Sequence, residues 1–236
     1  MARMVRKKII VTGAEGLLGT ELKRYLDFIP LTFKNCDVTD YDQVGKIFTK
    51  INPDITLHLA AISTVIEAAK NPKEAYRVNV EGTENVALWS KHLIYISTDY
   101  VFDGKKGNYR ENDIPFPQTI LGITKLLGEE RTRWADKYTI IRTSFKEIPF
   151  KHNQAPFDMY TSADYVPIIA YHIAQAIKNA DKLPKILHIG IHKRTLYDLA
   201  RKTRPNVKRI SIKEISFPLP KDCSLNTDLW KSLNLV

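Results

Sequence analysis

The stretch Lys8-Ile9-Ile10-Val11-Thr12-Gly13-Ala14-Glu15-Gly16-Leu17-Leu18-Gly19 decides the fold of this chain. Its β-branched run predicts a buried parallel strand, and the glycines then recur three residues apart as a helical pattern begins. Gly13 permits a tight turn, Gly16 lets the backbone approach a diphosphate, and Gly19 allows close packing of helix on strand. The stretch therefore predicts a dinucleotide-binding loop, in which the following helix offers free N–H groups to the phosphates.

Which dinucleotide binds is left open by the next predicted strand, residues 31–33. An acid at the tip of this strand normally binds the ribose hydroxyls of NAD, but the tip here reads Phe33-Lys34-Asn35. Asp37 lies at a suitable distance from the glycines, just before the next helix. Lys34 is compatible with a 2′-phosphate, so NADP(H) is slightly favoured over NAD(H); a solvated loop lysine is an equally good interpretation.

Strand and helix patterns alternate along most of the chain, which predicts an α/β fold of the Rossmann type with a doubly wound parallel sheet. Expected strands are 8–12, 31–33, 55–60, 93–97, 138–142 and 186–189; expected helices are 16–26, 40–51, 73–90, 120–135, 164–179 and 195–203. Residues 149–156 are polar and carry two prolines, which predicts a loop. We expect a dinucleotide-binding core over 1–145 and small substrate-lobe segments over 146–236, packed as one structural domain.

Composition narrows the class of protein further. The net charge of +10 is spread along all 236 residues without a basic arm, so small anionic ligands are favoured over nucleic acid. No run of about 18 apolar residues is present, and the first strand pattern follows the amino terminus at once, so we expect neither a membrane span nor a signal peptide. Two distant cysteines fit a cytoplasmic location, and no metal site is expected. His58 and His188 end apolar strands and are expected to be core residues.

Several later segments make the chain similar to one family over nearly its whole length. The segments are Tyr95-Ile96-Ser97-Thr98-Asp99-Tyr100-Val101-Phe102-Asp103-Gly104, His58-Leu59-Ala60-Ala61, Val78-Asn79-Val80, Leu121-Gly122-Ile123-Thr124-Lys125, Ile141-Arg142-Thr143-Ser144 and Pro220-Lys221-Asp222-Cys223-Ser224-Leu225-Asn226-Thr227. Together they resemble the dTDP-4-dehydrorhamnose reductase branch of the extended short-chain dehydrogenases. The resemblance implies a nicotinamide-dependent reduction of a 4-keto group on a nucleotide-linked deoxyhexose.

The resemblance also assigns roles to individual positions. Cofactor contacts are implied for Gly13, Gly16, Leu17, Asp37, Val38, Ala60, Ala61, Asn79 and Lys125, beside Gly19 and Lys34 from the loop argument. The catalytic threonine falls on Thr98 and the catalytic lysine on Lys125. The catalytic tyrosine falls on Leu121, which has no proton to give.

That substitution bears directly on catalysis. A tyrosine four residues before a lysine shares its helix face, and the lysine lowers the pKa of the phenol from about 10 so that it protonates the carbonyl oxygen. Losing such an acid costs roughly 10²- to 10⁴-fold in rate. A water, Tyr100 or Tyr109 is a candidate substitute, although packing roles are favoured for both tyrosines.

Two further departures affect the expected sugar pocket. Ile66 and Ala69 stand where the family has acids, and residues 145–158 are shorter than the family's substrate-lobe insertion. We expect an NAD(P)H-dependent reductase-like protein with reduced or rerouted catalysis and a nucleotide sugar as its small-molecule partner. The alternative is a non-catalytic, cofactor-binding regulatory subunit, as in methionine adenosyltransferase. An epimerase or dehydratase is a weaker hypothesis, because those reactions depend even more on a proton-transferring tyrosine. A homodimer or a complex with a partner enzyme is compatible with either.

Overall fold

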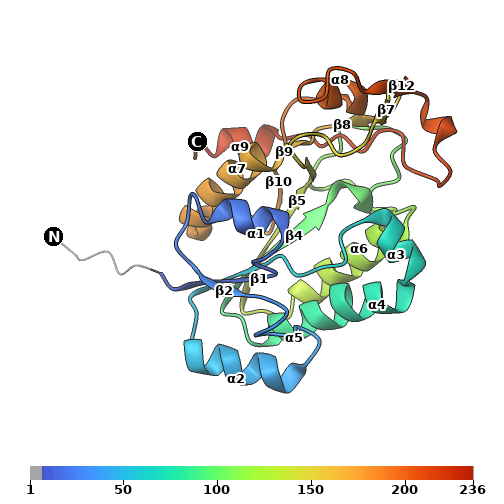
Figure 1. Ribbon diagram of the computed structural model, residues 1–236. Helices are drawn as coiled ribbons and strands as arrows, with labels where there is room; N and C mark the ends of the chain where they lie inside the picture. Colours follow the sequence, from blue (N-terminus) through green and yellow to red (C-terminus); the bar gives the residue numbers. More distant parts are fainter. Residues whose placement is uncertain (1–6, 236) are drawn as a thin grey trace.

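The computed structural model describes residues 7–235, and a six-stranded parallel sheet lies at its centre (Figure 1). In spatial order the strands are β10 (Ile186–His188), β5 (Lys137–Thr143), β4 (His92–Thr98), β3 (Ile55–His58), β1 (Ile9–Thr12) and β2 (Ile29–Leu31). From β1 the chain first adds β2 on one side and then β3 on the other. The predicted Rossmann-type α/β fold is confirmed, and the change of direction at β1 is where such sheets form their ligand crevice.

Helices cover both faces of the sheet. They are α1 (Leu17–Leu22), α2 (Tyr41–Ile51), α3 (Val65–Lys70), α4 (Pro72–Tyr76), α5 (Gly82–Leu88), α6 (Ile120–Thr132), α7 (Val166–Lys178), α8 (Leu196–Arg201) and α9 (Asp228–Ser232). In Figure 1, α1 and α7 lie on one side of the sheet, and α2 and α5 lie on the other. The side chain of Asp40 starts α2 by accepting a hydrogen bond from the Gln43 backbone N–H at 2.9 Å.

Alternating strand residues build two separate cores, as a sheet covered on both faces requires. Ile94 packs with Leu22 of α1 and Ile173 of α7 in one apolar cluster. Its neighbour Leu93 packs with Phe48 of α2 in the other. All five side chains are 2% exposed or less, so burial on both faces fixes the orientation of the sheet.

The segment after β5 forms a small lobe from three two-stranded sheets. Its strands are β6 (Phe145–Lys146), β7 (Gln154–Pro156), β8 (Tyr160–Thr161), β9 (Asp164–Tyr165), β11 (Arg194–Thr195) and β12 (Lys208–Ile210). They pair as β6 with β9, β7 with β12 and β8 with β11. The same part of the chain also supplies α7 and β10 to the main fold, so it contributes to both the lobe and the central sheet.

Several element bounds differ from those predicted. The helix expected at 16–26 ends at Leu22, and the second strand is Ile29–Leu31 because Ile29 pairs with Ile10 of β1. The expected loop at 149–156 contains β7, which pairs with the distant β12. The helix expected at 73–90 is divided into α4, a π-helical turn and α5. The short helices α3 and α9 carried too little periodicity to be predicted.

The π-helical turn spans Arg77–Glu81 and places Asn79 inside the fold. Asn79 is fully buried, and its side chain bonds both the N–H and the C=O of Ile62, at 2.8 and 3.0 Å. It also donates to the Thr124 hydroxyl of α6 at 3.0 Å. A wide turn at this point therefore connects the loop after β3 to α6.

Candidate functional site

The glycine loop between β1 and α1 has the geometry that its sequence predicted. Gly13 has φ of 64°, and a Cβ at this residue would lie 2.6 Å from the Ala60 backbone nitrogen. A Cβ on Gly19 would lie 2.7 Å from the Ala14 backbone, so α1 packs closely on the loop. Gly13 and Gly19 are therefore required by the protein's own packing.

Gly16 differs because nothing in the protein requires a glycine there. Its φ is −69°, and an added Cβ would meet only the Gly13 carbonyl oxygen, at 3.3 Å. No side chain caps the first turn of α1, and Leu17 beside it is 53% exposed. Open backbone and uncapped N–H groups at this spot fit a diphosphate, which a side chain on Gly16 would displace.

The tip of β2 is fixed by two side-chain contacts. Asn35 accepts a hydrogen bond from the Thr32 backbone N–H at 2.7 Å, and Glu15 of the glycine loop accepts one from the Phe33 N–H at 2.8 Å. Lys34 is exposed between them. The role of Glu15 was not predicted, because its position in the sequence does not reveal that it reaches the second strand.

Asp37 and Val38 shape the turn that leads into α2. The Asp37 carboxylate accepts from the Thr39 N–H at 2.9 Å and from the Thr39 hydroxyl at 2.7 Å. Val38 is buried, and its carbonyl accepts from Asn85 at 3.0 Å. Ala60 and Ala61 lie half-buried just past β3, where Ala60 borders Gly13. The structure thus brings Gly13 and Ala60 together, whereas one oxygen of the Asp37 carboxylate, Oδ1, is engaged by its own turn.

Thr98 ends β4 at the carboxyl edge of the sheet, opposite Thr143 of β5. Its hydroxyl accepts a hydrogen bond from the Tyr100 N–H at 3.2 Å and donates one to the Asp99 carboxylate at 3.2 Å. The side chain is partly exposed at this strand end. Because a hydroxyl has a single proton, donating it to a carbonyl oxygen would replace the bond to Asp99.

Lys125 lies on α6, which packs along β4. Its side chain is 6% exposed, and Nζ lies 4.0 Å from the centre of the Tyr95 ring. Burial lowers the pKa of Lys125 to about 7, while the Glu129 carboxylate acts in the opposite direction. An amine with this pKa gains or loses its proton readily near neutral pH.

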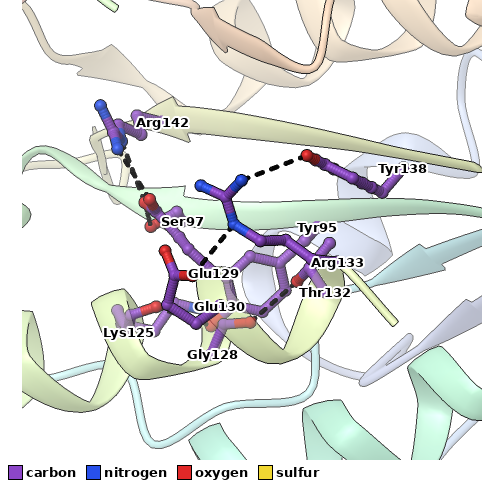
Figure 2. Close-up of polar contacts among 10 residues, drawn as sticks. All are labelled: Tyr95, Ser97, Lys125, Gly128, Glu129, Glu130, Thr132, Arg133, Tyr138 and Arg142. Atoms are coloured by element: carbon purple, nitrogen blue, oxygen red, sulfur yellow. Dashed lines mark hydrogen bonds and ion pairs between the residues drawn. The ribbon is translucent and has the colours of Figure 1, made fainter. Parts of the chain in front are cut away.

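Glu129, one turn further along α6, is committed to a buried ion pair (Figure 2). Its two carboxylate oxygens accept from Arg142 Nε at 3.0 Å and Nη2 at 2.7 Å, and Ser97 donates to it at 2.6 Å. Arg142 and Glu129 are both about 2% exposed. This network joins α6 to β4 and β5 one helical turn after Lys125. It therefore fixes the position of α6 along the two strands.

Leu121 is 5% exposed and belongs to an apolar cluster at the start of α6. Ala68 of α3 and Ala75 of α4 are its fully buried neighbours in the cluster, and the Tyr100 ring packs against it. No hydroxyl comes from position 121, one turn before Lys125. The small side chains of α3 and α4 leave room that the leucine fills.

Of the two candidate substitute tyrosines, Tyr109 is fully engaged elsewhere. Its hydroxyl donates to Asp103 and accepts from the Lys105 N–H at 3.0 Å, and its ring stacks on Phe102 at 4.2 Å. Tyr100 packs beside Leu121, and burial raises the pKa of its phenol well above the ordinary value. Tyr109 is thus a packing residue, and Tyr100 belongs to the apolar surroundings of Leu121.

A buried acid next to Thr98 was not predicted. Asp99 is 3% exposed, and burial raises the pKa of its carboxyl to about 6, with Lys146 of β6 acting to lower it. Asp99 thus accepts from the Thr98 hydroxyl and also feels the charge of Lys146 on the first strand of the lobe. Only tertiary structure brings Lys146 near it.

The two histidines singled out from the sequence lie in the core. His58 is fully buried, bonds Thr12 at 2.6 Å and Thr83 at 3.1 Å, and its pKa is lowered to about 3 by burial. His188 is also fully buried, with Nδ1 3.0 Å from the Tyr109 carbonyl oxygen. Over residues 7–235, no cluster of His, Cys, Asp and Glu has the form of a metal site. Within the same range, no helix combines the length and apolarity needed to cross a membrane.

A parallel sheet with this glycine loop, a threonine ending β4 and a lysine on α6 defines a dinucleotide-binding protein of the short-chain dehydrogenase class. The family model of the RmlD substrate binding domain matches residues 7–147. The chain belongs to this family, which confirms the resemblance to dTDP-4-dehydrorhamnose reductases.

Individual relatives agree with this membership. The chain is 42% identical over 206 residues to the spore coat polysaccharide biosynthesis protein SpsK of Bacillus subtilis, covering 78% of this chain and 73% of that protein. A dTDP-4-dehydrorhamnose reductase of Aggregatibacter actinomycetemcomitans is 34% identical, over 58% of this chain and 51% of the relative. Methionine adenosyltransferase 2 subunit beta of Danio rerio is also 34% identical, over 52% and 42%. The chain thus spans about half the length of these last two relatives.

Solved structures extend the similarity beyond the matched segment. The dTDP-4-dehydrorhamnose reductase of Bacillus anthracis, solved in complex with NADP, superposes with a TM-score of 0.88 at 28% identity. The match covers 98% of this chain and 94% of that one. The small lobe as well as the sheet is therefore common to both proteins.

Proposed function

We propose that this protein is an NAD(P)H-dependent reductase of a keto group on a nucleotide-linked deoxysugar, with proton delivery weakened at position 121. The observation that carries the proposal is the combination of the open backbone at Gly16, Thr98 at the end of β4 and the buried Lys125 amine over the Tyr95 ring of the same strand. Membership of the RmlD family and the NADP complex of the similar structure support it. The small lobe that follows β5, without α7 and β10, is the proposed sugar-binding part.

Each group has a distinct task in this proposal. The bound nicotinamide supplies the hydride. The uncapped N–H groups at α1 bind the diphosphate, and Lys125 binds the nicotinamide ribose. The Thr98 hydroxyl orients the substrate carbonyl and stabilises the negative charge that develops on its oxygen.

The test measures oxidation of NADH and NADPH with a dTDP-linked 4-keto-6-deoxyhexose. We expect slow, substrate-dependent turnover that falls in both Thr98→Val and Lys125→Met. Thr143→Val is the matched control, since Thr143 pairs with Thr98 across β4 and β5. Turnover unchanged in both site variants would contradict the assignment of these residues.

A second candidate is a cofactor-binding regulatory subunit without catalysis. Leu121 favours it, because an apolar cluster occupies the place of the proton donor. The similarity to the beta subunit of methionine adenosyltransferase 2 supports the same alternative. Coenzyme binding without any consumption, together with capture of a stable partner enzyme, would select it. Light scattering of the purified chain distinguishes a homodimer from a monomer that awaits a partner.

A further inference from the structure

Glu15 links the glycine loop to the tip of β2. Its Oε1 accepts the Phe33 backbone N–H at 2.8 Å, beside the bond from Ala14 N–H to the Leu31 carbonyl at 3.1 Å. Glu15 is exposed, and its second carboxylate oxygen has no partner among residues 7–235. A negative charge is thus held at a fixed place on the surface of the loop.

The position of this carboxylate matters because of what such a strand tip normally does. In dinucleotide-binding folds an acid about 20 residues after the first glycine binds the ribose 2′-hydroxyl of the adenosine half. Phe33 stands at that distance from Gly13, and its exposed phenyl ring accepts no hydrogen bond. Glu15 therefore places a carboxylate beside the Phe33 backbone, at a position whose own side chain has no carboxylate.

We infer that Glu15 selects the coenzyme and favours NAD(H) over NADP(H). Its open carboxylate oxygen accepts a hydrogen bond from the adenosine 2′-hydroxyl, and the same charge repels a 2′-phosphate. The inference rests on the proposed function, because it requires the dinucleotide to lie along the glycine loop. It also opposes the slight preference for NADP(H) expected from Lys34.

The competition between Glu15 and Lys34 is decided by how each charge is held. The Glu15 carboxylate is fixed by a backbone hydrogen bond. Both side chains are exposed, so salt screens both charges, but Lys34 carries its ammonium on a flexible stem, and holding it against a phosphate costs side-chain entropy. A fixed charge in direct contact outweighs a mobile one, and repulsion prevails.

The experiment measures binding, not turnover, by calorimetric titration with NADH and with NADPH. We expect the wild-type protein to bind NADH about tenfold more tightly or better, a preference that weakens as salt rises. Glu15→Gln keeps an acceptor for the Phe33 N–H and removes the charge, so NADPH affinity should rise and the preference disappear. Glu21→Gln, an acid on α1 that pairs with Arg24, is the matched control and should leave the preference unchanged.

Three results would overturn the inference. They are equal or tighter wild-type binding of NADPH, an unchanged preference in Glu15→Gln with unaltered thermal unfolding, and a preference abolished equally by Glu21→Gln. In each case coenzyme still binds, so the proposed function stands. Binding of neither coenzyme would overturn the proposed function and the selection by Glu15 together.

Discussion

The glycine loop and the start of α6, at the two ends of the candidate site, differ in one respect. Packing within the protein accounts for the residue at the start of α6 but not for every glycine of the loop. At the glycine loop, Gly16 is a glycine although only one backbone oxygen, of Gly13 at 3.3 Å, would crowd a side chain there, so its lack of a side chain suits an external ligand. At the start of α6, Leu121 is packed among alanines and needs no ligand to explain it. Under the proposed function, the contrast means that the glycine loop keeps a form suited to a coenzyme while position 121 keeps no group that protonates a substrate.

The strongest test of this contrast restores the phenol. Leu121→Tyr places a hydroxyl one turn before Lys125, and we expect reductase turnover to rise by roughly 10²- to 10⁴-fold. Leu121→Phe is the matched control, because it adds the ring without the proton. The larger side chain costs stability by about 1–3 kcal/mol in both variants, so thermal unfolding is measured alongside. If turnover rises in both variants, or in neither, the missing phenol at position 121 is not what limits catalysis.

The next test asks whether the ion pair behind Lys125 holds α6 in place. Glu129→Ala leaves the Arg142 guanidinium buried without its partner, and we expect the unfolding free energy to fall by about 3–5 kcal/mol in urea titrations. Glu130→Ala breaks an exposed pair with Arg133 on the same helix and should cost less than about 1 kcal/mol. Similar losses in the two variants would mean that the buried network contributes no more than a surface pair.

A third test separates folding from binding within the glycine loop. Gly13→Ala forces a side chain onto a backbone with φ of 64° and into Ala60, so we expect a loss of about 1–3 kcal/mol of stability. Gly16→Ala should change stability by less than about 0.5 kcal/mol and still weaken coenzyme binding. Calorimetric affinities and urea titrations of both variants provide the measurements. Full coenzyme affinity in Gly16→Ala would show that the open backbone does not face the diphosphate.

The smallest expected effect is a pH dependence from Lys125. Its pKa in the folded protein is about 7, below the ordinary 10.5, so between these values the unfolded chain holds a proton that the folded chain lacks. The unfolding free energy contributed by this residue therefore rises with pH across that window. Thermal unfolding of the wild type minus that of Lys125→Met should show this rise. A flat difference between about pH 7 and 9 would place the amine in a more solvated setting.

The sequence predicts the central sheet well because its signals are local. The glycine loop, the Asp40 cap and the apolar runs of β3, β4 and β5 each identify an element without reference to the rest of the chain. By contrast, β7 is a strand only because β12 pairs with it from about fifty residues away, and no local pattern records that pairing. The π-helical turn at Arg77–Glu81 likewise depends on the hydrogen bonds of Asn79 to Ile62 and Thr124, which come from other elements.

The candidate site follows the same division. The three glycines follow from their spacing, whereas Thr98 and Lys125 follow from the family resemblance, and the roles of all five stay a prediction. The positions of Glu15 at the β2 tip and of Lys146 near Asp99 depend on contacts between elements. Sequence spacing identifies groups that share one element, whereas charges that meet across elements require the folded structure.

The placement of β10 has a consequence for how the chain acquires its structure. Leu187 and Ile189 enter the same core as Val11, near the other end of the sequence, and β10 covers the edge of β5. During synthesis, the amino-terminal two thirds therefore emerge with an unpaired β5 edge and an apolar surface awaiting α7. The last strand of the sheet leaves the ribosome long after the first. We expect a fragment truncated after residue 147 to aggregate, because it lacks both β10, which pairs with the β5 edge, and α7, which covers the apolar face.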